Sequence, residues 1–156
     1  MGNAGARHLA TLFAALLISL PAHASEWWYV TASTDNNVFF TDTQSIQRQG
    51  VTAVFWEYEI YKTPIAKTVS VKIQYSLDCS SKRMSGLASV TYDAAGTAIS
   101  SDGPIASFSI APDTVGDAVQ KFVCASGPDR QRLGTKLALS PEESAKRIFA
   151  ITNAPQ

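Results

Sequence analysis

One stretch, Val69 to Cys79, constrains the fold of this chain more than any other. Its odd-numbered positions are apolar or cysteine, and its even-numbered positions are polar. Side chains of a strand point alternately to two faces, so this alternation predicts a strand with one buried face. Cys79 lies on that buried face, at the end where the strand stops. A thiol there predicts a partner across from it, and the chain has one other cysteine, Cys124.

The first 24 residues read as a secretion signal and not as part of the fold. An apolar run from Leu9 to Leu20 is followed by the small-x-small pattern Ala22-His23-Ala24. A helix of that length rises about 18 Å, which is too short for a bilayer core of about 30 Å. We predict cleavage between Ala24 and Ser25, which leaves one domain at 25–156; an uncleaved anchor is the alternative. No cysteine follows the apolar run, so no lipid anchor is expected.

The exported part is nearly neutral and has both cysteines. Its 12 basic side chains face 13 acidic ones, a formal net charge of −1, and no basic block or acidic tail is present. Nucleic acid and anionic membranes are therefore poor partners. Two cysteines in an exported chain predict a disulfide between Cys79 and Cys124. By closing a loop in the unfolded chain, this disulfide would stabilise the fold by about 4 kcal/mol. Two free thiols or an intermolecular bridge are the alternatives.

The remaining pattern predicts strands joined by short turns, followed by helices. Aromatic and β-branched runs favour strands at 27–32, 38–41, 51–61, 67–79 and 84–92, with shorter candidates at 97–101 and 105–110. Asp42 to Ile46 is expected as a single helical turn capped by Asp42. The spacing of the strands predicts an antiparallel meander.

Two helices are expected after the strands. Apolar residues recur with the helical period from Val115 to Val123, just before Cys124. Ser140-Pro141 combines a cap residue with a first-turn proline and predicts a C-terminal helical extension at about 140–151. The segment from Asp129 to Leu139 is polar and irregular and has at most a short strand.

The residues that usually carry acid-base chemistry are scarce. Both histidines, His8 and His23, lie in the predicted signal. Their removal excludes Ser-His-Asp and Cys-His arrangements and the usual zinc sites. With both cysteines paired, no thiolate remains as a nucleophile. We therefore expect no enzyme, no catalytic residue, no metal site and no cofactor.

Glu57 and Glu59 are the remaining candidates for catalysis. In a strand they share one face at about 6.6 Å, a separation compatible with an inverting glycosidase pair. The alternative is a solvated strand face whose charges pair with Lys67 and Lys72 on the next strand. The sequence favours that alternative, because nothing marks a cleft. A carboxylate-based hydrolase is kept as a third hypothesis for function.

Large aromatic side chains crowd the first half of the mature chain. Neighbours in a strand, such as Trp27 and Trp28, point to opposite faces. Both faces of the N-terminal hairpin therefore carry rings, and we expect helices to cover only one. Two interpretations stay open: a core that wraps both sides, or an exposed aromatic patch for protein contact or self-association.

A series of short motifs runs from Trp27 to Cys124 in a defined order. They are Trp28-x-Val30, Val38-Phe39-Phe40-x-Asp42-x-x-Ser45-Ile46, a strand with Trp56, Tyr75-Ser76-Leu77-Asp78-Cys79, Tyr92-x-x-x-Gly96, Ile110-x-Pro112 and Val123-Cys124. Together they resemble the surface-adhesin protein E family of bacterial exported domains. The resemblance implies an α+β fold, in which an antiparallel β-sheet of about six strands packs against a C-terminal helix tethered by a disulfide.

The same resemblance implies a function. We expect an exported, non-enzymatic, adhesin-like domain with its core at about 27–125 and with protein partners such as host extracellular-matrix or serum proteins. Its expected location is the periplasm, the medium or the outer surface, and a homodimer is compatible with all three. The alternative is a periplasmic structural or envelope-associated module with no host ligand. The family offers no compact binding motif to place on this chain, so no binding residue is predicted.

Overall fold

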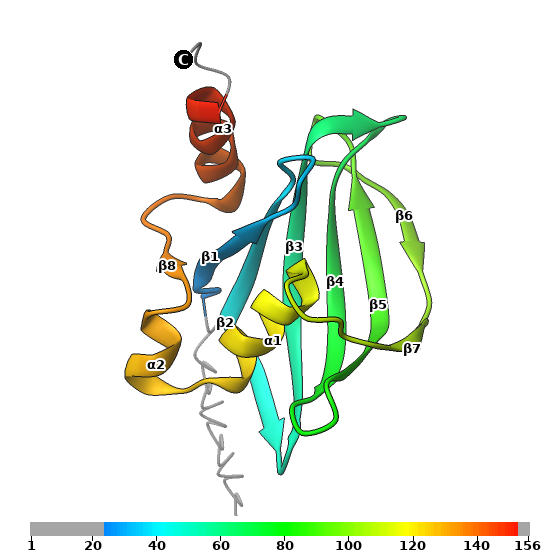
Figure 1. Ribbon diagram of the computed structural model, residues 1–156. Coiled ribbons are helices and arrows are strands. Elements are labelled where there is room, and N and C mark those ends of the chain that lie inside the picture. Colours follow the sequence, from blue (N-terminus) through cyan, green and yellow to red (C-terminus); the bar gives the residue numbers. More distant parts are fainter. Residues whose placement is uncertain (1–23, 153–156) are drawn as a thin grey trace, which may run out of the picture.

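The computed structural model describes residues 24–152 (Figure 1), so the predicted signal lies outside the described residues except for Ala24. Eight strands form one antiparallel sheet in the order β6-β5-β4-β3-β2-β1-β8, and β7 also pairs with β5. The strands are β1 (Trp27–Ala32), β2 (Val38–Gln49), β3 (Thr52–Ile65), β4 (Thr68–Asp78), β5 (Arg83–Tyr92), β6 (Ala98–Asp102), β7 (Ile105–Ser109) and β8 (Thr135–Lys136).

Strand β4 lies near the middle of this sheet, as its alternating sequence predicted. It pairs with β3 without a break from Thr52↔Asp78 to Ile60↔Ser70. Its other neighbour is β5, so both of its sides are hydrogen-bonded. The antiparallel meander predicted from the strand spacing is therefore confirmed for β1 to β6.

Three helices follow the strands: α1 (Val115–Cys124), α2 (Gly127–Gln131) and α3 (Pro141–Thr152). Helix α1 packs on Phe55 of β3, whereas α3 packs on Tyr58 and Ile60 of the same strand. Odd and even positions of a strand face opposite ways, so the two helices cover opposite faces of the sheet. Figure 1 shows α1 crossing the sheet and α3 standing beside its β1 end.

The buried residues accordingly form two clusters, one on each face. The α1 cluster contains Ala53, Phe55, Leu77, Met84, Ile110, Val119, Phe122 and Val123. The α3 cluster contains Val38, Phe40, Tyr58, Ile60 and Ala145, with Trp27, Tyr29, Leu137, Ile148 and Phe149 packed around them.

The disulfide joins the sheet to α1. Cys79, directly after β4, is bonded to Cys124, the last residue of α1, and their Cα atoms are 5.8 Å apart. Both side chains also pack against the α1 cluster. The fold class, with a disulfide-tethered helix on an antiparallel sheet, is confirmed.

The helical turn predicted for 42–46 is wrong. This segment continues β2, with a register shift against β3 between Asp42 and Gln47. The carboxylate of Asp42 accepts a hydrogen bond from the Gln44 amide, and the Ser45 hydroxyl donates to the Asp42 carbonyl. These are the local bonds of a cap, but here they stabilise a bulge, because the Trp56 amide of β3 donates to the Ser45 hydroxyl.

Other differences lie near the ends of the sheet. The sheet has eight strands where about six were expected, because the short candidates β6 and β7 both pair with β5 and β8 adds to β1. The segment before α3, which was predicted to be irregular, also contains the short helix α2, whose second residue is Pro128. No helix in the described part of the chain is long and apolar enough to cross a membrane.

Candidate functional site

Both faces of the N-terminal hairpin are covered, so the aromatic side chains form a core that wraps both sides. The Trp28 ring lies 5.8 Å from Phe122 of α1, and the Trp27 ring lies 5.8 Å from Tyr58 on the α3 side. The expectation that helices cover only one face is wrong. Helix α3 covers the second face with three apolar residues, Ala145, Ile148 and Phe149.

Lys72 lies at the centre of the α3 face. Its Nζ atom is 4.6 Å from the ring centre of Tyr58, 5.5 Å from Tyr92 and 5.7 Å from Trp27. A cation within about 6 Å of an aromatic ring is attracted by the ring's quadrupole. Strands β1, β3, β4 and β5 each contribute one of these four residues, so sheet pairing alone assembles the cluster.

The Tyr58 hydroxyl connects this cluster to α3. It donates a hydrogen bond of 2.9 Å to Glu142 and lies 3.1 Å from the hydroxyl of Ser70. Burial raises the pKa of Tyr58 to about 12, so the phenol keeps its proton at neutral pH. Burial opposes ionisation of Glu142, but hydrogen bonds from its own amide, Tyr58 and Ser140, and the charge of Lys72, outweigh it and lower its pKa.

Two hollows meet at these groups. One, of about 550 Å³, lies between α3 and the sheet, and we call it the α3 groove. Its apolar walls include Ile60, Val69, Tyr92, Ala145 and Phe149. The second, of about 640 Å³, runs past Trp27 toward Ala24. Lys72 and Glu142 line both hollows, so they stand at the junction.

Glu57 and Glu59 lie on the opposite face, and the structure does not support a solvated pair there. Glu57 is only 6% exposed. Burial raises its pKa to about 8, with a further contribution from the Glu59 carboxylate, so Glu57 is largely protonated at neutral pH. Burial also raises the pKa of Glu59, against a hydrogen bond donated by Asn37.

The predicted pairing of these carboxyl groups with Lys67 and Lys72 is wrong. Lys72 is the cross-strand partner of Tyr58 and therefore shares its face, whereas Glu57 pairs with Ile73. Lys67 is exposed in the turn between β3 and β4. A raised pKa would suit a general acid, but Glu57 is buried and a substrate cannot reach it, so this pair offers little support for a hydrolase.

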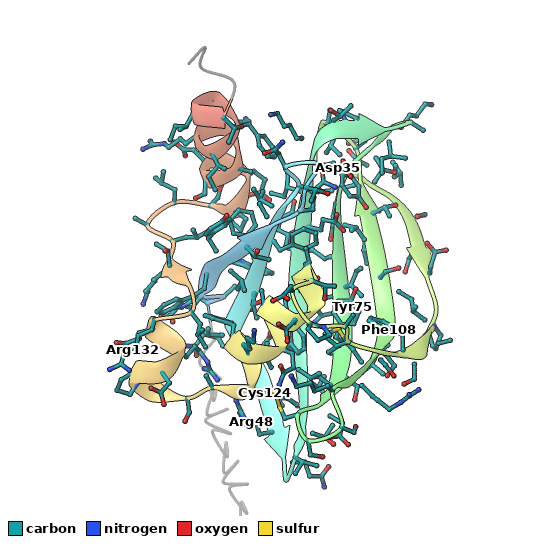
Figure 2. The ribbon with its side chains drawn as sticks, in the orientation of Figure 1. Asp35, Arg48, Tyr75, Phe108, Cys124 and Arg132 are labelled. Atoms are coloured by element: carbon teal, nitrogen blue, oxygen red, sulfur yellow. A yellow bond between two sulfur atoms is a disulfide. The ribbon has the colours of Figure 1, made fainter. Side chains whose placement is uncertain are left out.

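A third feature is the outer edge of the sheet, formed by β6 and β7, which we call the open edge. Both strands pair with β5 on one side only, and every residue in them is exposed. Three apolar side chains of these strands, Ile99, Ile105 and Phe108, are 41–44% exposed. Figure 2 labels Phe108 on this outer part of the sheet. The only charged residue in either strand is Asp102.

A glycine explains how β7 fits here. A Cβ added at Gly86 would lie 2.8 Å from Cδ1 of Ile105, which is too close for any side chain. Gly86 pairs with Ile105, so its missing side chain lets β7 lie flat against β5. The sequence predicted a strand at 105–110 but did not predict that it forms an exposed edge, because exposure depends on which strands lie beside it.

The opposite edge of the sheet differs. There β8 pairs with β1 through only Trp28↔Lys136 and Tyr29↔Thr135. Lys136 also forms an ion pair with Glu26. A strand of two residues offers little backbone for a further partner. The open edge is therefore the longer free edge in the part of the chain that the structure describes.

The remaining predicted site residues are those of the disulfide and of the signal cleavage position. Cys79 and Cys124 form the disulfide described above, and the predicted cleavage position at Ala24 and Ser25 stays a prediction. Among residues 24–152, no three His, Cys, Asp or Glu side chains gather as a metal site would require. The structure thus presents two candidate surfaces, the α3 groove and the open edge.

Comparison with known proteins gives a family. The model of a family described as surface-adhesin protein E matches residues 27–125. A crystal structure of Haemophilus influenzae protein E (crystal form II) is 18% identical with a TM-score of 0.49, covering 62% of this chain and 86% of that one. Protein E from non-typeable Haemophilus influenzae is 16% identical with a TM-score of 0.44, covering 79% and 88%. No curated protein matches the chain.

Proposed function

Because the chain belongs to the surface-adhesin protein E family, we propose that it is an exported, non-enzymatic adhesin whose partner is an extracellular-matrix or serum protein of a host. The observation that carries this proposal is the family match over residues 27–125. That range includes β1 to β7, α1 and the disulfide, but not β8 or α3.

The open edge is the surface that we assign to protein binding. It lies inside the matched range, whereas α3, which forms one wall of the α3 groove, lies outside it. An edge strand presents unpaired N–H and C=O groups to which an extended segment of another chain can add. The partner is therefore expected to contribute an extended segment.

The side chains at the open edge support such an arrangement. Strand β7 has the sequence Ile-Ala-Ser-Phe-Ser and carries no charge of its own. The charged groups at this edge are Asp102 of β6 and Arg83 of β5, which donates hydrogen bonds to Ser107 and Ser109. Main-chain hydrogen bonds would supply affinity, and the exposed side chains of Ile105 and Phe108 would supply apolar contacts. Natural edge strands that avoid such pairing usually carry lysine or proline.

A binding measurement tests both parts of the proposal. The purified mature chain, 25–156, is passed over immobilised fibronectin, collagen and serum albumin, and binding is followed on a biosensor. We expect saturable binding to at least one of them. The Phe108→Lys variant should bind about tenfold more weakly or worse, since it places a charge on the edge. Ile151→Lys is the matched control, because Ile151 is an exposed apolar residue of α3, outside the family match.

Each outcome has a definite meaning. Absence of binding to every matrix and serum protein tested would contradict the host-adhesin proposal. Binding that Phe108→Lys leaves intact would remove the open edge as the contact surface. A matching melting temperature for the two variants ensures that a lost signal reports the edge and not unfolding.

Cell fractionation tests the location. If the protein is an adhesin, protease added to intact cells should degrade it, and some should be found at the surface or in the medium. Protein found only in the periplasm would support the alternative of an envelope-associated module with no host ligand.

A further inference from the structure

The ammonium group of Lys72 lacks a polar partner in the structure. It forms no ion pair or hydrogen bond with any of the described residues, and its neighbours are the rings of Tyr58, Tyr92 and Trp27. A lysine ammonium has three N–H donors, and ring faces attract the charge without accepting these bonds as an oxygen would. The donors of Lys72 are thus available to an acceptor that enters from outside.

The surroundings of this ammonium are largely apolar. The α3 groove opens beside it with a volume of about 550 Å³. Ligand sites of proteins usually measure about 300–1,000 Å³ and combine apolar walls with a few polar groups. Here the apolar walls come from Ile60 and Val69 on the sheet and from Ala145 and Phe149 on α3. The charged groups of the lining are Lys72, Asp93, Glu142 and Lys146.

We propose that the α3 groove binds a small amphipathic anion, with its carboxylate on Lys72 and its apolar body between α3 and the sheet. An anion matches the ammonium of Lys72, whose donors have no acceptor among the described residues, because an ionised donor and an ionised acceptor form a strong charge-assisted hydrogen bond. The apolar body matches the walls. This activity goes beyond adhesion, and it stands or falls independently of the open edge.

Two carboxylates of the groove lining, Asp93 and Glu142, oppose such a ligand, and the one on which the charge of Lys72 acts is Glu142. Its carboxylate lines the same groove and remains ionised at neutral pH, because its pKa is lowered. The Tyr58 hydroxyl bonds it at 2.9 Å, which holds it at the α3 side of the junction. Lys146 also lines the groove and partly balances this charge. Removing the charge of Glu142 should therefore strengthen binding, whereas removing that of Lys72 should weaken it.

The test uses octanoate as the probe, with 1-octanol and octyltrimethylammonium as neutral and cationic analogues of the same chain length. Binding to the mature chain is followed by tryptophan fluorescence, since Trp27 lies beside Lys72. We expect saturable binding of octanoate, about tenfold weaker binding of octanol and still weaker binding of the cation.

Three variants locate the site. Lys72→Met should weaken octanoate binding about tenfold and leave octanol binding unchanged, because it removes the charge and keeps the length of the side chain. Glu142→Gln should tighten octanoate binding, and its amide oxygen can still accept the hydrogen bond of Tyr58. Lys67→Met is the matched control, since Lys67 is an exposed lysine outside the groove, and it should change nothing.

A measurement on the unmodified protein covers the case in which Lys72→Met does not fold. Octanoate should shift the amide NMR signals of Tyr58, Lys72, Tyr92 and Phe149 more than those of α1. Absence of saturable binding, equal affinity for octanoate and octanol, or shifts centred elsewhere would each overturn the proposal.

Discussion

The two faces of the sheet are both covered by a helix, but they are closed in different ways. On the α1 face, Phe55, Leu77 and Phe122 have no exposed surface, and a disulfide holds the helix in place. On the α3 face, Ala145 is the one apolar residue of the helix, proline aside, that is fully buried, and a hollow remains beneath it. A hollow of about 660 Å³ also lies along α1, so the two faces differ in how much of each helix is buried and in the disulfide, and not in the presence of a hollow.

Electrostatics add to this asymmetry. Arg48 and Arg130 both donate hydrogen bonds to the Val123 and Ala125 carbonyls at the C-terminal end of α1. Figure 2 shows Arg48 close to Cys124 at this end. Positive charge at a helix C-terminus is stabilising, since the helix dipole is negative there. Helix α3 has no basic residue in its last turn. The covalent and the electrostatic anchors thus both act on α1.

The largest effect is expected from Phe122→Ala on the α1 face. The ring is fully buried and contacts Trp28, so its loss should lower the free energy of unfolding by about 3–5 kcal/mol. Urea denaturation measures this. The matched control is Phe108→Ala at the open edge, which should cost less than about 1 kcal/mol because that ring is 41% exposed. Equal losses would contradict the assignment of Phe122 to the buried core.

Removal of the disulfide should have the next largest effect. In the double variant Cys79→Ser, Cys124→Ser, the unfolded chain is no longer closed across a sequence separation of 45, so stability should fall by about 2–4 kcal/mol. Non-reducing urea denaturation checks this. Added reductant should destabilise the parent protein and leave the double variant unaffected. A parent protein that is insensitive to reductant would contradict the tether.

A smaller effect is expected on the α3 face. Phe149→Ala removes a half-buried ring, so the loss should be about 1–2 kcal/mol. Hydrogen exchange should show faster exchange in α3 and unchanged exchange in α1, because the two helices pack into separate clusters on opposite faces of the sheet. Faster exchange in both would mean that the two faces unfold together and that the comparison above fails.

The smallest effect concerns pH and Glu57. Its pKa is raised from 4.5 to about 8 in the folded protein, so the folded state binds a proton more tightly than the unfolded state. This contribution to stability is complete below about pH 4.5 and is lost as the pH rises through about 8. Between pH 7 and 8 the parent protein should lose on the order of 1 kcal/mol more than Glu57→Gln. Parallel pH profiles would contradict a protonated Glu57.

The sequence predicted strands and helices better than it predicted the environment of individual side chains. The alternation from Val69 to Cys79 identified a central strand, and Ser140-Pro141 located the start of α3, because both signals are local. The segment 42–46 shows the limit. Asp42 and Ser45 make the hydrogen bonds of a cap, as their residue types suggest, but pairing with β3 keeps the backbone extended.

The candidate surfaces depended on information that the sequence does not contain. Glu57 reads as a surface charge from its own strand, yet it is buried, because the neighbouring strands place Thr41 and Ile73 on either side of it. Lys72 reads as a partner for that charge, although its cross-strand neighbour is Tyr58. The cluster of Lys72 with Trp27, Tyr58 and Tyr92 contains residues from four strands, so it can be recognised only when the order of the strands in the sheet is known.

The unequal edges of the sheet also limit how copies of this protein can associate. On one side, free backbone is divided between the ends of β1 and the part of β2 beyond Asp42, whereas β6 and β7 leave ten residues free on the other. Polymerisation through strand addition needs two usable edges on each copy. Two copies that pair through their open edges would use up the longer free edge of each, so strand addition of this kind would stop at a dimer.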